Sequence, residues 1–140
     1  MIRVKSRKER VIIKAIDEIE KVFEEYSSET AIDAISLISK NGVPIASHLK
    51  DEEITESFST LSATILGANE VIFSEFEKEE PELITGESAD TVLLIKEVDS
   101  NTVLSVLTDS GMKDEMIDKM EGIISEIGFF ETSELAGVKE

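Results

Sequence analysis

Apolar residues recur along the first part of the chain at the spacing of one helical face. From about Lys8 to Tyr26 they follow steps of four, three, four and three, which is typical of an amphipathic helix. These residues are Ile12, Ile16, Ile19, Phe23 and Tyr26. Charged side chains fill the other positions, so we expect this helix to lie on the surface with one side against a core.

Two runs rich in β-prone residues come next, with a short polar turn between them. The runs are AIDAISLIS (31–39) and VPIASHL (43–49), and Lys40, Asn41 and Gly42 separate them. An Asn-Gly pair in this position is the strongest short hairpin signal, because both residues tolerate the positive φ of a type I′ turn. The sequence therefore predicts a β-hairpin that turns at Asn41 and Gly42.

A long helix is predicted from Asp51 to about Lys78, with Pro81 closing it off. At about 100° per residue its apolar positions form two neighbouring stripes. The first stripe is Ile54, Phe58, Leu61, Ile65, Ala68, Ile72 and Phe76, and the second is Ser62, Leu66, Asn69 and Phe73. Together they make an arc too wide for a helix that contacts only its own sheet.

Three further strands and a last helix complete the predicted fold. The strands are ELITGES (82–88), TVLLIKEV (91–98) and NTVLSVLTD (101–109), and the helix runs from about Met112 to Ile127. Short connections favour antiparallel neighbours. The last two strands are apolar at both odd and even positions, so we expect both faces of the sheet to be covered.

The predicted fold class is an α/β (α+β) sandwich with the order α-β-β-α-β-β-β-α. A five-stranded antiparallel sheet carries the long crossover helix on one face and the two terminal helices on the other. The length of 140 residues suits one domain, which we place at 1–128 with a basic segment at 1–10. Residues 129–140 are expected to form an acidic tail that is partly ordered at most.

Charge is distributed unevenly along the chain. The formal net charge of −17 argues against nucleic acid as a partner, because binding phosphates requires clustered Lys and Arg. Residues 1–14 nevertheless hold six basic residues against Glu9 alone. This segment is either a solvated helix start attracted to the acidic body, or a docking arm for an acidic partner or an anionic membrane.

The residue types that usually carry catalysis are scarce. There is no cysteine, and His48 is the one histidine, for which a structural or surface role is favoured over general-base work. No Gly-rich phosphate loop is present, so any GTP belongs to a partner. Arginines stand only at positions 3, 7 and 10, so the sequence offers an arginine finger only from the N-terminal segment.

Metal, membrane and compartment signals are equally sparse. The acidic groups at 51–53 and at Glu75, Glu77, Glu79 and Glu80 fit solvated helix ends better than a metal site. We assign no catalytic, cofactor-binding or metal-binding residue. No apolar run approaches the roughly 20 residues of a transmembrane helix, and the opening residues lack a signal-peptide core. The expected location is cytoplasmic.

The element order and two motifs resemble the roadblock family of dynein light chains and MglB-like GTPase regulators. The more specific motif is the hairpin ISLISKNGVPIAS, in which an apolar strand leads to a polar-Gly turn and a small apolar strand ending in Ala-Ser. The second is LSVLTDSGM (104–112), which is similar to the family's last strand and the entry to its final helix. The likeness covers about residues 8–127.

The resemblance implies a roadblock/profilin-like fold and a non-enzymatic homodimer that binds a small Ras-like GTPase. In the family, long helices pair and third strands meet edge to edge, and the second stripe would suit this pairing. The interface then contains Ser62, Leu66, Asn69, Phe73, Leu83 and Ile84. Two alternatives remain: Leu66 and Phe73 pack under the terminal helices or a loop, or the sandwich encloses a small molecule that it senses.

Overall fold

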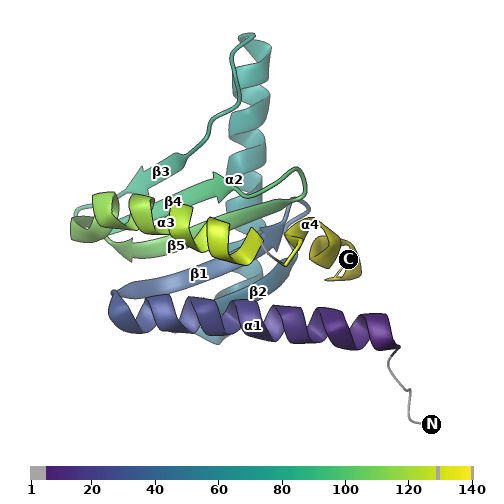
Figure 1. Ribbon diagram of the computed structural model, residues 1–140. Coiled ribbons are helices and arrows are strands. Elements are labelled where there is room, and N and C mark those ends of the chain that lie inside the picture. Colours follow the sequence, from purple (N-terminus) through teal and green to yellow (C-terminus); the bar gives the residue numbers. More distant parts are fainter. Residues whose placement is uncertain (1–5, 129, 140) are drawn as a thin grey trace.

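The computed structural model describes residues 6–128 and 130–139 and confirms the predicted sheet (Figure 1). The strands are β1 (Ile32–Ser39), β2 (Pro44–Leu49), β3 (Ile84–Glu87), β4 (Thr91–Glu97) and β5 (Thr102–Asp109). All neighbours are antiparallel, in the order β2-β1-β5-β4-β3. β5 therefore lies at the centre, while β2 and β3 are the two edges. The predicted third strand is shorter than expected and begins at Ile84.

Helices cover both faces of the sheet, as predicted (Figure 1). They are α1 (Arg7–Glu29), α2 (Thr55–Glu75), α3 (Lys113–Gly128) and α4 (Thr132–Lys139), with short 3-10 turns η1 (Glu52–Ile54) and η2 (Ser110–Met112) before α2 and α3. The larger core joins α1 and α3 to one face of the sheet, with Ile19, Phe23, Met120 and Ile123 fully buried. α2 covers the other face and packs against Ile95 and Val103 through Leu66.

The β1–β2 hairpin is confirmed, but its turn is not type I′. Gly42 has a φ of +93°, whereas Asn41 is not among the described residues with positive φ. The Gly42 N–H donates to the Ser39 carbonyl at 2.9 Å, so Lys40 and Asn41 form the turn and Gly42 follows it in the left-handed region. A Cβ at Gly42 would stand 3.1 Å from the Thr60 Cα, which ties this turn closely to α2.

The C-terminal segment contains a helix that the sequence pattern did not predict. α4 buries Leu135 and Ala136 against the larger core. The Thr132 hydroxyl donates to the Asp99 carboxylate, and the Asn101 amide donates to the Ser133 hydroxyl, both partners coming from the β4–β5 connection. These long-range contacts join α4 to the sheet, and the expectation that the tail is partly ordered at most stays a prediction. Residues 1–5 of the predicted basic segment lie outside the described residues.

Candidate interaction surface

Small hydroxyl side chains form part of the contact between α2 and the sheet, beside the apolar cluster around Leu66. Ser36 of β1 hydrogen-bonds with Ser47 at 2.7 Å and with Ser59 of α2 at 3.1 Å. Ser62 of α2 hydrogen-bonds with Ser105 of β5 at 2.8 Å. Short side chains allow the helix to approach the strands closely, and the paired hydroxyls satisfy one another where water is excluded. This contact fixes which side of α2 faces inward.

Dimer pairing through the second stripe would require that stripe to face outward. In the structure Ser62 and Leu66 of this stripe face the chain's own sheet instead. Ser62 and Leu66 are each only 2% exposed, because the chain's own sheet covers them. The single chain therefore does not present Ser62 and Leu66 at its surface, and Leu66 packs on the sheet rather than under a terminal helix or a loop. Asn69 is half-buried, and its amide donates to the Ile65 carbonyl of the same helix.

The outward side of α2 carries large apolar side chains instead. We define the outer face of α2 as Ile54, Leu61, Val71, Ile72, Phe73 and Phe76. Leu61 is 61% exposed and Phe76 is 71% exposed. These six are all but two of the large exposed hydrophobic residues in the part of the chain that the structure describes. The surface is dominated by the first stripe, with Phe73 from the second.

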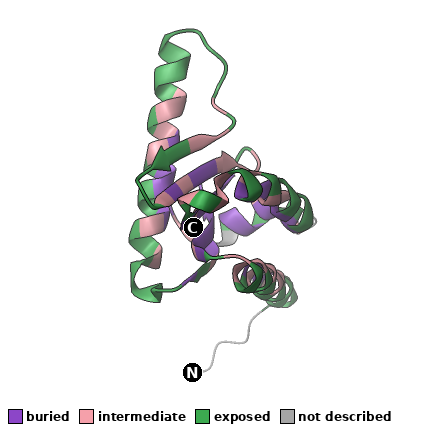
Figure 2. Ribbon diagram, turned by 90° about the vertical axis from the view of Figure 1, so that its left-hand side faces the viewer, coloured by how far each residue is buried: buried purple, intermediate pink, exposed green. Residues whose placement is uncertain are grey.

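The end of α2 extends beyond the sheet, which explains why several sides of it are exposed. In Figure 1 its last turns rise past β3, and Figure 2 shows them in the colour of exposed residues. Val71, Ile72 and Phe73 are consecutive in the sequence and point in different directions, yet all are exposed because no strand lies beneath them. An apolar helix end of this kind is typical of a surface that another protein covers.

An unpaired strand edge lies beside this helix. β3 pairs with β4 on one side only, and Thr85, Gly86 and Glu87 are exposed. Ile84 is half-buried against the α2 side of the sheet, whereas Leu83 packs on the larger core. Of the predicted interface residues, Phe73 and Ile84 thus lie at the α2 and β3 surface. Leu83 is turned toward the opposite layer.

A cluster of charged residues joins α2 to the segment that follows it, to the β1–β2 turn and to the end of β4. The Lys40 ammonium lies 2.9 Å from a Glu97 carboxylate oxygen and 3.6 Å from a Glu70 oxygen. Oxygens of Glu70, Glu80 and Glu97 lie within 4.8 Å of one another. Burial, together with the charge of Glu80, raises the pKa of Glu70 against the opposing effect of Lys40. Of the acidic residues noted in the sequence, Glu80 is the one that joins this cluster.

The pKa of Lys40 shows which interaction dominates in the cluster. Burial alone would lower it, but the hydrogen bond and the charge of Glu97 outweigh that effect, so the pKa is raised. Lys40 is therefore held in its charged form and supplies the cation that the carboxylates need. The cluster serves to fasten the β1–β2 turn to α2 and β4.

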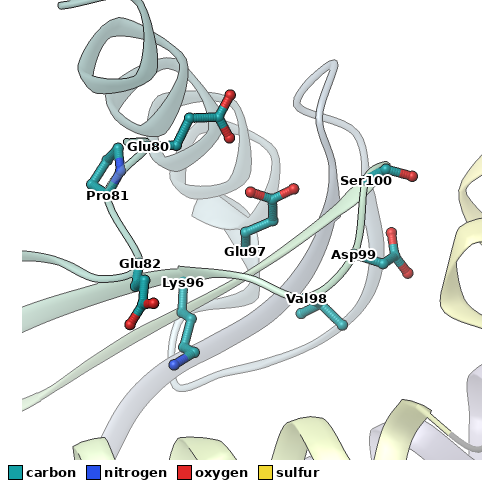
Figure 3. Close-up of a pocket in the computed structure, with 8 residues that line it drawn as sticks. All are labelled: Glu80, Pro81, Glu82, Lys96, Glu97, Val98, Asp99 and Ser100. Carbon is teal, nitrogen blue, oxygen red and sulfur yellow. The ribbon is translucent and has the colours of Figure 1, made fainter. Parts of the chain in front are cut away.

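Beside this cluster lies an open pocket of about 550 Å³ (Figure 3). The residues that line it are Glu80, Pro81, Glu82, Lys96, Glu97, Val98, Asp99 and Ser100. Lys96 points away from Glu97 in Figure 3 and forms an ion pair with Glu121 of α3. Asp99 accepts hydrogen bonds from Thr132 and from the Asn101 N–H. The central polar groups are therefore already engaged in holding the fold. His48, exposed on β2, is not among the lining residues.

These features define a protein whose most distinctive surface is apolar and suited to contact with another protein. The family model of the Roadblock/LC7 domain matches residues 18–108, and the chain belongs to this family. Members of the family are regulators or adaptors rather than enzymes. Within the described residues, no helix has both the length and the hydropathy to cross a membrane.

Solved structures support the same assignment. MglB of Myxococcus xanthus is similar with a TM-score of 0.68 and 25% identity, over 82% of this chain and 96% of that one. A Roadblock/LC7 domain of Streptomyces avermitilis has a TM-score of 0.67 and 16% identity, over 72% of this chain and 86% of that one. No curated protein matches the sequence.

Sequence reasoning missed Leu61, Ile72 and Phe76 as surface residues, although all three were placed on the first stripe. The available signal was side-chain size. Serine and alanine at positions 59, 62 and 63 are suited to close packing on strands, whereas large aliphatic and aromatic residues on the other side need more room.

Proposed function

We propose that this chain is a homodimeric, non-enzymatic adaptor that regulates or tethers a small Ras-like GTPase. The dimer interface consists of the outer face of α2 together with the open edge of β3. The observation that carries the proposal is the concentration of large exposed apolar side chains next to an unpaired edge strand. A monomer with such a surface would be prone to aggregate, and isologous pairing of two copies covers both features at once.

The proposed interface residues follow from burial in the single chain. Leu61, Ile72 and Phe76 replace Ser62 and Leu66, and Phe73 and Ile84 are retained. Pairing across β3 would satisfy its free backbone groups, while the overhanging end of α2 would pack on its symmetry mate. The Glu70, Glu80 and Lys40 cluster lies behind this surface and holds the overhang in position.

The GTPase partner is supported by family membership and by the structural likeness to MglB. It is also supported by the resemblance of the sequence motifs to MglB-like GTPase regulators. The chain lacks a phosphate-binding loop, so the nucleotide and its chemistry would belong to the partner. The small-molecule alternative is less well supported, because the pocket of Figure 3 is acidic and open, and its central groups are already paired. A cysteine-free composition is consistent with a cytoplasmic location.

The first test is the solution mass by light scattering. The wild-type chain should have twice its mass of 15.5 kDa, and Leu61→Glu should return it to the mass of one chain. Val11→Glu is the matched control, because Val11 has the same 61% exposure but lies on α1. A monomeric wild type, or dissociation by Val11→Glu as well, would overturn the proposed interface.

The second test addresses the partner. Titration calorimetry of the dimer against a Ras-like GTPase, loaded in turn with GDP and with a non-hydrolysable GTP analogue, should show binding that depends on the nucleotide. The same titration with Leu61→Glu separates the two parts of the proposal. A dimer that binds neither nucleotide state would retain the interface but remove the GTPase from the proposed function.

A further inference from the structure

The first two turns of α1 carry positive charge on an otherwise acidic molecule. We define the basic end of α1 as Arg7, Lys8, Arg10, Val11, Ile13 and Lys14, all of which are exposed. In Figure 1 this end of the helix extends past the strands and lies below α4. The exposure of the inward side chains of α1 rises in the same direction, from 0% at Phe23 and Ile19 to 9% at Ile12. The basic end can therefore approach a broad surface without the sheet intervening.

Most of the described lysines elsewhere form internal ion pairs, which sets them apart from three of the four basic residues at this end of α1. Six of them pair with carboxylates: Lys21, Lys40, Lys50, Lys96, Lys113 and Lys119. Arg7, Lys8 and Lys14 form no ion pair with any residue that the structure describes. The positive charge that remains available to a partner is thus concentrated in two helical turns, which calls for an anionic partner.

Two exposed aliphatic residues flank the charges. Val11 is 61% exposed and Ile13 is 38% exposed, and they are the large exposed hydrophobic residues that remain once the outer face of α2 is set aside within the described chain. At about 100° per residue they lie on opposite sides of the line formed by Arg7, Arg10 and Lys14. Long basic side chains beside an exposed aliphatic one suit the headgroup layer of a bilayer, where the ammonium and guanidinium groups reach phosphates and Val11, about 40° from Arg7 around the helix, enters the acyl boundary.

The arrangement distinguishes a lipid surface from an acidic protein. Arg7, Arg10 and Lys14 lie along one line of the helix, and Lys8 stands about 100° from Arg7 around it, so the basic groups extend from that line onto a second side. A folded partner would need a fixed surface shaped to this spread. Lipid headgroups move laterally and can gather around it. We propose that the basic end of α1 binds the anionic surface of a lipid bilayer.

The acidic body does not prevent this contact at ordinary ionic strength. Charges more than about 10 Å away are largely screened at about 0.1 M salt, so the groups nearest the membrane dominate. The nearest opposing charge is Glu9, within the same two turns, and Asp17 and Glu18 follow one turn beyond Lys14. Each basic residue removed from the contact should lower the vesicle partition coefficient about fivefold. Binding should weaken steadily as salt is raised.

The test is co-sedimentation of the full chain with vesicles of phosphatidylcholine, with and without phosphatidylserine. The triple variant Arg7→Gln, Lys8→Gln and Lys14→Gln should lower partitioning onto the phosphatidylserine vesicles about a hundredfold. The matched control changes the same total charge elsewhere, through Lys21→Gln, Lys50→Gln and Lys113→Gln. Circular dichroism of both variants reports whether they remain folded.

The contribution of the aliphatic residues is measured separately. Val11→Ser with Ile13→Ser should weaken binding while leaving its salt dependence unchanged, because no charge is altered.

Three outcomes would overturn the proposal. They are failure of the wild type to bind phosphatidylserine vesicles at about 0.1 M salt, equal losses in the two triple variants, or equal binding to neutral vesicles. Binding to soluble polyglutamate but not to vesicles would reassign the basic end of α1 to an acidic protein. The oligomeric state of the same samples tests the proposed dimer independently.

Discussion

Two leucines five residues apart on α2 allow a direct test of which side of the helix faces inward. Leu66 is 2% exposed and packs against Ile95 and Val103, whereas Leu61 is 61% exposed. Truncation of a buried leucine to alanine removes its transfer free energy and leaves a cavity, so Leu66→Ala should lower the free energy of unfolding by about 3 kcal/mol. Leu61→Ala in an isolated chain should change it by less than about 0.5 kcal/mol.

The comparison needs a monomeric background, because dimer formation would itself bury Leu61. Both substitutions are therefore made with and without Ile72→Glu, which places a charge on the outer face of α2 where Ile72 is 53% exposed. Urea unfolding followed by circular dichroism gives the four differences. With Ile72→Glu present, the cost of Leu66→Ala should persist. The cost of Leu61→Ala should then fall to near zero, having been larger in the dimer.

The reasoning fails if Leu61→Ala costs as much as Leu66→Ala in the monomeric background. That result would mean that the inward side of α2 is the first stripe after all. Equal small effects for both leucines would show that α2 is not packed on the sheet. Light scattering of each sample establishes the oligomeric state in which the free energies were measured.

Three other substitutions test particular contacts. Gly42→Ala should lower the thermal midpoint, because it meets both the φ of +93° and the 3.1 Å approach to Thr60, at a cost of roughly 1–3 kcal/mol. Ser62→Ala should cost about 1–3 kcal/mol in urea unfolding by orphaning the Ser105 hydroxyl, and the double Ser62→Ala, Ser105→Ala variant should cost less than the sum of the singles. The raised pKa of Glu70 means that the folded state holds its proton more tightly than the unfolded state, so this group favours folding most at pH below 4.5 and loses that contribution as pH rises through its raised pKa. Glu70→Gln should therefore reduce the loss of stability between that pH and neutrality, measured as the urea midpoint across the range; a wild-type profile identical to that of the variant would contradict the direction of the shift.

Local sequence pattern was sufficient for the sheet. The runs around Ile35, Leu94 and Val106 are apolar over more than one parity and are bounded by polar turns, so each strand could be recognised without its neighbours. Short connections then determined the antiparallel pairing. The predicted coverage of both faces followed from the same double parity.

The orientation of α2 could not be read from hydrophobicity. Both stripes are apolar enough to be buried, and the choice depends on which one fits the strands. Ser59 and Ser62 fit because Ser36 and Ser105 stand opposite them. That correspondence joins residues far apart in the sequence and becomes visible only when the strands are in register.

Two smaller differences between the predicted and the observed structure also involve contacts between residues far apart in the sequence. α4 spans only eight residues, which is too short for a clear helical pattern in the sequence. It is held in place by contacts with the β4–β5 connection. The hairpin position followed from Asn41 and Gly42, but the contact of this turn with Thr60, whose hydroxyl donates to the Gly42 carbonyl, joins residues far apart in the sequence. Local pattern thus identified the five strands and the three longer helices, while α4 and the inward side of α2 depend on long-range contacts.

Different side chains of α2 face inward and outward, and this separation affects which substitutions the protein can tolerate. The side chains that fold the monomer, among them Ser59, Ser62 and Leu66, are separate from those that face outward, such as Leu61 and Ile72. Substitutions on the outward side can therefore accumulate with little penalty to the monomer. If the proposed dimer forms, the same scaffold could pass from pairing with itself to pairing with a diverged copy, and so acquire new assemblies while its own core stays the same.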